Sequence, residues 1–465
     1  MNASSASSSR RAGGNPLGTE PVGNLLRRFA VPSIIAMLVS SLYNMVDQLF
    51  IGHSIGILGN AATNVAFPLS MTCTAIALLC GIGGAANFNL CLGRKENEQA
   101  RSYVGNALSM LVILGITLCL IVQIFLRPMM LLFGATPDVI DYACTYTRIT
   151  SLGFPVLILT TGGSNLIRAD GSPKYSMMCN LVGAITNTIL DPLFIFVFHM
   201  GMAGAALATI IGQMVSGCMV IFYLTRFQTV PLSLRDLKPS LSRWGQIAAL
   251  GATPCFNQLA MMVVQIVMNN TLTHYGASSM YGSDIPLACA GIISKVNMLF
   301  FSFVIGISQG LQPIVSFNYG ARKYPRVQEA YLKAVTAATV ICVIAFCCFQ
   351  IFPRQIISIF GSGSEEYLHF AERYFRIYLF CSFLNGFQPV TSNFFTSIGK
   401  PKKGIFLSLT RQILFLLPLL LIFPYLFGID GVMYTAPIAD FAAAAFSIAL
   451  VFRELSAMRR LPCLE

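Results

Sequence analysis

Two copies of one short segment, 227 positions apart, show that the chain is built from a duplicated unit. The first copy, QIFLRPMMLLFG, covers residues 123–134, and the second, QIFPRQIISIFG, covers residues 350–361. Three further glycine pairs keep the same register: Gly93 with Gly320, Gly201 with Gly428 and Gly204 with Gly431. A unit of roughly 225 residues is far longer than the repeats of solenoid proteins, so we expect two like halves.

The composition places these halves in a membrane. The chain has 465 residues, of which 55% are hydrophobic and only 10% are charged, whereas soluble domains carry about 25% charged residues. So much apolar surface requires lipid as the solvent for most of the chain. The polar beginning, MNASSASSSRRAGGNPLG, has no apolar core, so we expect a disordered lead over residues 1–28 rather than a signal peptide.

Apolar runs long enough to cross a bilayer occur about twelve times, since one crossing needs about 20 residues. We therefore predict an all-α membrane protein with six spans in each half. The expected spans are 29–51, 62–88, 103–126, 143–166, 177–198, 202–225, 246–272, 285–315, 331–352, 374–398, 404–427 and 431–452.

Basic residues orient these spans. Alternate loops and the two termini hold 23 of the 30 Lys and Arg residues, and the other set of loops holds only Arg127, Arg354 and Arg373. Positive loops face the cytoplasm, so both termini are expected there, in a bacterial cytoplasmic membrane. The net charge of +12 thus reports topology and does not indicate nucleic-acid binding.

Six spans return the chain to its starting side, so the halves must be parallel and related by an axis along the membrane normal. We expect bundles over residues 29–226 and 245–453, a cytoplasmic linker at 227–244 and a tail at 454–465. A cavity between the bundles follows from this architecture, and Met261 is typical of a promiscuous cavity lining. We expect a monomer without a cofactor, because the fourteen cysteines lie mostly in apolar runs and the four histidines are scattered.

Acidic residues inside the spans are the candidates for chemistry, because intramembrane charges are costly. Asp47 lies in the first span, toward its outer end, where a snorkelling or paired residue is the alternative. Asp191 lies in an otherwise uncharged fifth span, with Asn187 four residues earlier on the same helical face and Pro192 directly after it. This set suits a hard cation or a proton carrier, and the sequence does not separate Na⁺ from H⁺.

The second half carries a different polar set. Lys295 and Arg411 could each counter Asp440 or meet an anionic substrate, and Asp440 aligns with Gln213 of the first half. Arg148 and Arg376 occupy equivalent positions, and we expect them to pair with a loop carboxylate such as Glu372 or Asp141. Asp191 aligns near Leu419, which indicates that the acids did not survive in both halves.

Four motifs together resemble the multidrug and toxic compound extrusion (MATE) family, DinF-like branch, over residues 20–455. They are YNMVDQLFIG at 43–52, RADGSPK at 168–174 with its echo GKPK at 399–402, NTILDP at 187–192 and GMAGAA at 201–206. The resemblance implies a V-shaped antiporter that exports cationic or amphipathic compounds in exchange for Na⁺ or H⁺. It also implies a cation site formed by Asp47, Asn187, Asp191 and Thr209, with Tyr146 as the candidate tyrosine of the fourth span.

One branch of this family has a glutamate on the seventh span, but this chain has Gln258 and Gln265 there and no acid. Coupling is therefore expected in the first half, and Gln258, Met261, Gln265, Lys295, Arg411 and Asp440 are expected to line the substrate cavity. The alternative transport function is a flippase for lipid-linked oligosaccharides, whose pocket should be rich in arginine. A receptor or a membrane enzyme is disfavoured, because no nucleophile–base or metal set is visible.

Overall fold

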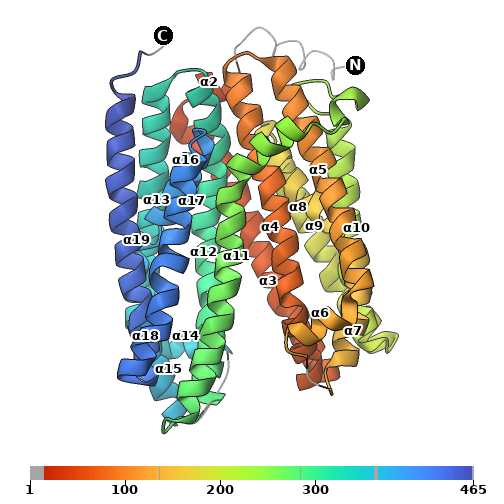
Figure 1. Cartoon of the computed structure of the whole chain (residues 1–465), viewed down its shortest axis with the longest axis vertical. Coiled ribbons are helices and arrows are strands. Elements are labelled where there is room, and N and C mark those ends of the chain that lie inside the picture. Colours follow the sequence, from red (N-terminus) through yellow and green to blue (C-terminus); the bar gives the residue numbers. More distant parts are fainter. Residues whose placement is uncertain (1–14, 136, 283, 361–364, 463–465) are drawn as a thin grey trace.

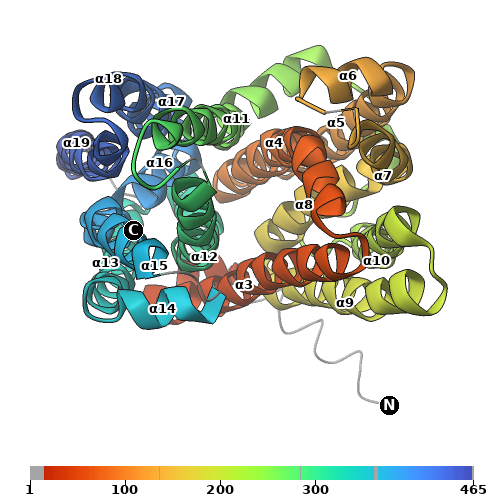
Figure 2. The same ribbon diagram turned by 90° about the horizontal axis from the view of Figure 1, so that it is seen from below.

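The computed structural model describes residues 15–135, 137–282, 284–360 and 365–462, and no strand occurs in these segments. The helices form two bundles that lie side by side, and α2, the first described helix, lies at the same end of the molecule as the last turn of α19 (Figure 1). The view along the bundles places α3 to α10 in one group and α11 to α19 in the other (Figure 2). This arrangement is the all-α, two-bundle fold that the duplicated sequence predicts.

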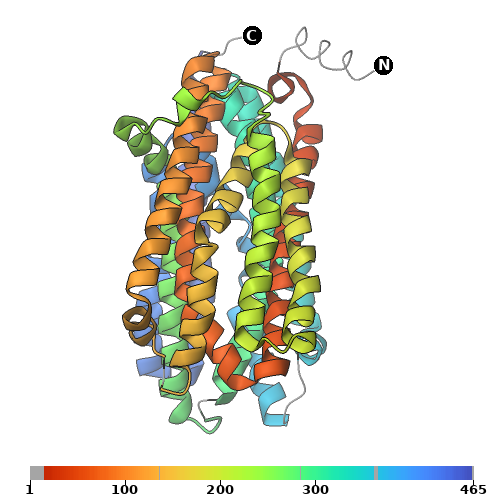
Figure 3. The ribbon, with the colours of Figure 1, turned by 90° about the vertical axis from the view of Figure 1, so that its right-hand side faces the viewer.

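The helices of the N-terminal half follow the expected spans closely. They are α2 (Pro16–Thr19), α3 (Val22–Ile55), α4 (Ile57–Gly93), α5 (Asn97–Ile124), α6 (Leu126–Leu132), α7 (Ile140–Leu152), α8 (Phe154–Ala169), α9 (Pro173–Pro192), the π-helix η2 (Leu193–Val197) and α10 (Gly201–Leu224). Seen from this half, α9 and α10 run beside each other (Figure 3).

The C-terminal half repeats this order. After the linker turn η3 (Leu234–Leu237) come α11 (Leu241–Ala277), α12 (Asp284–Gly320), α13 (Tyr324–Ile351), α14 (Pro353–Phe360), α15 (Glu365–Tyr378), the short η4 (Ser382–Leu384), α16 (Phe387–Ser397), α17 (Pro401–Leu409), the π-helix η5 (Thr410–Leu416), α18 (Leu417–Phe427) and α19 (Ile429–Met458).

Ten helices of the described residues are long and apolar enough to cross a membrane. The other two expected spans, 143–166 and 374–398, are each divided into two pieces: α7 with α8, and α15 with α16. Pro155 and Pro389 lie in the first turn of the second piece, where a missing N–H costs least. The fourth span of each half is therefore broken near the same place.

The repeated segment makes the same contact in both halves. Gln123 Nε2 donates to the Arg148 carbonyl oxygen at 2.8 Å, and Gln350 Nε2 donates to the Arg376 carbonyl oxygen at 2.9 Å. Each glutamine thus ties the end of the third span to the fourth. The short helices α6 and α14 follow directly and lie across the end opposite α2 (Figures 1 and 2).

The basic residues near these helices form ion pairs. Arg376 pairs with Glu372 at 2.9 Å, as expected, whereas Asp141 pairs with Arg127 at 3.7 Å instead of with Arg148. In the second half the counterpart of Arg127 is Arg354, which pairs with Glu365 at 2.9 Å. These exposed pairs contribute little to stability and do not form part of a site.

Equivalent glycines end the fourth span in each half. Gly171 has φ +89° after α8, and Gly399 has φ +77° after α16. A residue with a Cβ is strained in this conformation, which explains a glycine at both positions.

The two halves approach closely at the end that carries α2. A side-chain carbon at Gly83 would lie 2.1 Å from the Ile247 carbonyl oxygen, and one at Gly251 would lie 1.8 Å from that of Leu79. Only glycine permits such backbone contact between α4 and α11. Farther along, Ser41 of α3 and Ser302 of α12 are hydrogen-bonded at 2.9 Å.

The linker between the halves is fixed to the N-terminal bundle. Asp170, at the end of α8, accepts hydrogen bonds from the backbone N–H groups of Gln228 and Thr229 at 2.8 and 2.9 Å and from the Tyr223 hydroxyl at 2.8 Å. Asp236 pairs with Arg101 of α5 at 3.0 Å. Residues 227–240 therefore belong structurally to the first half.

Helical structure extends beyond the expected spans at the beginning of α3 and at the end of α19, and it includes part of the lead that was expected to be disordered. Residues 1–14 of the expected disordered lead lie outside the described residues, but residues 15–28 form α2 and the start of α3. Leu17 is buried there, and its carbonyl oxygen accepts a hydrogen bond from Asn318 Nδ2 at 2.8 Å. At the other end α19 continues through Glu454, which is buried and held by Lys400 and by Lys403 at 2.6 Å.

Candidate functional site

Two carboxyl groups meet inside the N-terminal half. Asp47 of α3 and Asp191 of α9 are both buried, and their side chains are within hydrogen-bonding contact. Asp47 Oδ1 has no hydrogen-bond partner among the described residues. Two ionised carboxylates in contact repel each other, so this arrangement requires a shared proton or a bound cation.

Asn187 connects Asp191 to α10. Its Nδ2 lies 3.4 Å from both Asp191 Oδ1 and Thr209 Oγ1. With the amide turned over, its nitrogen donates to Asp191 Oδ2 at 3.2 Å and its oxygen accepts from the Thr209 backbone N–H at 3.2 Å. The second orientation satisfies both ends of the amide, so Asn187 holds the acid and α10 in one network.

Tyr146 of α7 closes the cluster from the other side. Its side chain lies near Thr209, Asp47 and Asp191. Tyr146 and Thr209 both line a cavity of about 40 Å³, together with Thr150 and Gln213. This volume exceeds the roughly 10–15 Å³ that one water molecule needs, so a water or a small ion fits beside the two residues.

The five residues proposed from the sequence for the cation site therefore lie together, on α3, α7, α9 and α10. Directly after Pro192 the chain continues as the π-helix η2. Carboxylate, amide and hydroxyl oxygens are the ligands of hard cations. The same cluster can instead hold one or two protons.

Sequence reasoning missed Tyr43 as a neighbour of this cluster. Its side chain lies near Asp47 and Asp191. Tyr43 stands four residues before Asp47, so the i−4 spacing on one helical face was the signal that could have identified it. The position of Gln213 was not foreseeable, because it depends on the break between α7 and α8.

In the C-terminal half, Arg411 and Asp440 form the charged pair. Arg411 Nε lies 2.6 Å from Asp440 Oδ1, with 12% and 2% of the two side chains exposed. Of the two partners that the sequence allowed for Asp440, the structure thus selects Arg411. Lys295 is exposed on α12 and takes no part in this pair.

The polar residues of α11 lie apart from that pair. Gln258 Nε2 contacts Met71 Sδ of α4 at 2.7 Å, across the boundary between the halves. Gln265 donates to Asn269 Oδ1 at 3.0 Å on its own helix, and Met261 is 45% exposed. Gln258 thus lies where the two halves meet, whereas the placement of Met261 and Gln265 in a substrate cavity stays a prediction.

Known proteins share this two-part architecture. The family model for MatE matches residues 32–193 and 254–422, which is one match in each half and most of the chain. The chain belongs to the MatE family. The two matched segments correspond to the duplicated halves, which confirms the architecture inferred from the repeat.

Relatives of this MatE chain cover nearly its whole length. It is 24% identical to the multidrug export protein MepA of Staphylococcus haemolyticus, over 92% of each chain, and 24% identical to an FAD transporter of Shewanella oneidensis, over 90% of this chain and 92% of the relative. The solved structure of a MATE family transporter of the MOP superfamily in an outward-facing conformation superimposes with a TM-score of 0.88 at 23% identity, covering 96% of this chain and 98% of that one.

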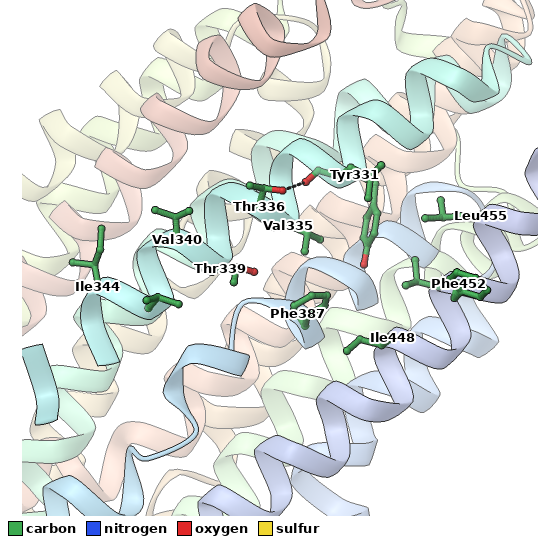
Figure 4. A pocket seen from close by; sticks show the side chains of 13 residues that line it. Tyr331, Val335, Thr336, Thr339, Val340, Ile344, Phe387, Ile448, Phe452 and Leu455 are labelled. Carbon is green, nitrogen blue, oxygen red and sulfur yellow. Dashed lines mark hydrogen bonds between the residues drawn. The ribbon is translucent and has the colours of Figure 1, made fainter. Parts of the chain in front are cut away.

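A groove of about 630 Å³ lies elsewhere on this MatE fold, on the outer face of the C-terminal half (Figure 4). It is formed by α13, α16 and α19. Its lining residues are apolar apart from the hydroxyl groups of Tyr331, Thr336 and Thr339. In the described part of the chain, no charged side chain lines this groove, so it offers no counterpart to the polar chemistry of the two clusters described above.

Proposed function

We propose that this chain is a multidrug efflux transporter that exports cationic or amphipathic small molecules in exchange for Na⁺ or H⁺ by alternating access. The observation that carries the proposal is the contact between the Asp47 and Asp191 carboxyls, with Asn187 and Thr209 beside them. Buried acids inside membrane spans are costly and are retained where they bind or relay ions.

The cluster can couple an ion to a change of shape. When both acids are ionised and no cation is bound, their repulsion favours separation of α3 from α9. A proton or a Na⁺ ion removes the repulsion and favours the contact seen here. Asp47, Asn187, Asp191 and Thr209 are the proposed ligands, and Tyr146 lies beside Thr209. The ion thereby shifts the population between two states of the transporter.

The two halves are in close contact at one end of the molecule, and the orientation of this end in the membrane defines the state of the transporter. The glycine contacts join the C-terminal half of α4 to the N-terminal third of α11, and these parts of the two helices lie toward the end of the bundles where α2 is found (Figure 1). We place that end in the cytoplasm of a bacterial cell, because the basic loops gather there. The arrangement is then closed to the cytoplasm, and we propose that one chain in the bilayer is the working unit.

A flippase for lipid-linked oligosaccharides, or a carrier of another pyrophosphate compound, is less consistent with the site. Such ligands need free arginines. Of the two cationic side chains expected in the substrate cavity, Arg411 is already paired with Asp440, so Lys295 alone would be left to bind such a ligand.

Drug susceptibility tests the proposal in cells. Expression of the chain in a bacterium that lacks its own exporters should raise resistance to cationic dyes and drugs. Asp191→Asn should abolish this resistance while the amount of protein in the membrane stays normal. Full resistance in the variant would remove Asp191 from the mechanism.

A further inference from the structure

The Arg411–Asp440 pair is a buried ion pair inside the C-terminal half, between η5 and α19. Asp440 lies in α19, with Pro437 one turn before it, and Arg411 lies in the π-helix η5. Asn385, from the break between α15 and α16, lies next to the Asp440 side chain, and Tyr378 lies beside both charges. Three irregular pieces of helix thus converge on one carboxylate.

The repeat relates this place to the candidate cation site. Asp440 is 227 residues after Gln213, and Arg411 is 227 residues after Ala184. Gln213 lines the same small cavity as Thr209, one turn away along α10, and Ala184 lies about one turn before Asn187 in α9. The charged pair therefore occupies, within about one helical turn, the position in the second half that the cation cluster has in the first.

The broken fourth span strengthens this correspondence. In the first half, the break at Gly153 lies against the sixth span, since a side-chain carbon there would lie 2.9 Å from Gln213 Oε1. In the second half, the break brings Asn385 to Asp440. In both halves, the break in the fourth span thus lies beside a residue of the sixth span, Gln213 or Asp440. Among the described residues, a positively charged side chain contacts this residue in the second half and not in the first.

We propose that the Arg411 guanidinium is a tethered cation, which permanently occupies the carboxylate of the second half and prevents that half from binding an ion of its own. The inference rests on the proposed function of the first half. A guanidinium stays charged at all physiological pH values and cannot diffuse away. The second half then resembles a permanently loaded cation site.

Removal of the tethered charge should create a cation site. In Arg411→Ala the Asp440 carboxylate remains buried without its partner, and the truncated side chain leaves space beside Asn385 and Tyr378. An uncompensated buried charge is strongly destabilising. A small cation from solution, guanidinium above all, should enter and restore stability.

The test is the thermal unfolding of the purified full-length protein in detergent at constant ionic strength. Millimolar guanidinium chloride or NaCl replaces choline chloride, and four proteins are compared: the wild type, R411A, R411K and R411A/D440N. The midpoint for R411A should rise by several degrees with guanidinium and by less with Na⁺. R411K and R411A/D440N should respond no more than the wild type.

The pair of variants R411A and R411A/D440N isolates Asp440, because both keep the first-half acids. Equal responses of these two proteins would overturn the proposal. If R411A does not fold, R411Q and R411Q/D440N replace them with the same two expected responses. Unfolding does not measure transport, so a negative result removes the tethered cation and leaves the antiport proposal to its own tests.

Discussion

Asp47 of α3 and Asp191 of α9 bring their carboxyl groups into contact inside the N-terminal bundle. The two acids lie on the first and fifth spans, and Asn187 holds the second acid to α10. This contact links a helix at the boundary between the halves to the core of one half. The charge of these two carboxyl groups therefore directly affects how α3 packs against α9.

Removal of either carboxyl should abolish binding of the coupling ion. Asp47→Asn and Asp191→Asn each leave one acid, which can neither share a proton in the same way nor provide two carboxylate ligands. The measurement is the dependence of the unfolding midpoint on Na⁺ and on pH: the Na⁺ dependence should be lost in both variants, and the pH dependence should become weaker. Asp141→Asn, an exposed acid that pairs only with Arg127 at the outer surface, is the matched control and should keep both dependences.

Asn187 should contribute to ion affinity through its amide. Asn187→Leu removes the link between Asp191 and Thr209, and we expect the affinity for the coupling ion to fall about tenfold, or about 1.4 kcal/mol. Asn180→Leu is the matched control, because Asn180 lies on the same helix and bonds only to the Ser176 carbonyl oxygen. An equal loss in both variants would show that the effect is general damage to α9.

Gly251 should be needed for the two halves to close at the end of the molecule that carries α2. Gly251→Val places a side chain on the Leu79 carbonyl oxygen, so α11 and α4 must separate. We expect efflux to be lost and cysteine reagents to reach Cys80 of α4, which is buried in the closed arrangement. Gly245→Val is the control, since a Cβ there meets nothing within 4 Å. Protection of Cys80 in Gly251→Val would contradict this role.

Asp170 should fix the linker to the first half. Asp170→Ala leaves the N–H groups of Gln228 and Thr229 and the Tyr223 hydroxyl without their acceptor, and each such loss costs about 1–3 kcal/mol when buried. Hydrogen exchange in residues 226–240 should accelerate, and the unfolding midpoint should fall. The exposed Asp138→Ala provides the reference. Unchanged exchange in the linker would mean that other contacts hold it.

The sequence predicted the architecture because the length of the apolar runs and the duplication can both be read from the order of residues, without knowledge of how the helices pack. It did not predict the π-helices η2 and η5, since these depend on packing against the sixth spans. The order of residues 15–28 was missed for a similar reason, because Leu17 is buried only against the second half.

The candidate site was predicted in part. The spacing of Asn187 and Asp191 indicated a shared helical face, but only the fold shows that Asp47 and Tyr146 reach the same place. The choice between Lys295 and Arg411 as the partner of Asp440 required the structure, because helices α12, α19 and η5 are distant in sequence.

Efflux from proteoliposomes under separately imposed gradients tests the account most directly. Vesicles containing the purified protein are loaded with a cationic dye, and a Na⁺ gradient or a pH gradient is applied alone. The account predicts that at least one gradient drives dye transport by the wild type and that neither does so with Asp191→Asn. Absence of transport under both gradients in the wild type, or equal transport in the variant, would contradict it.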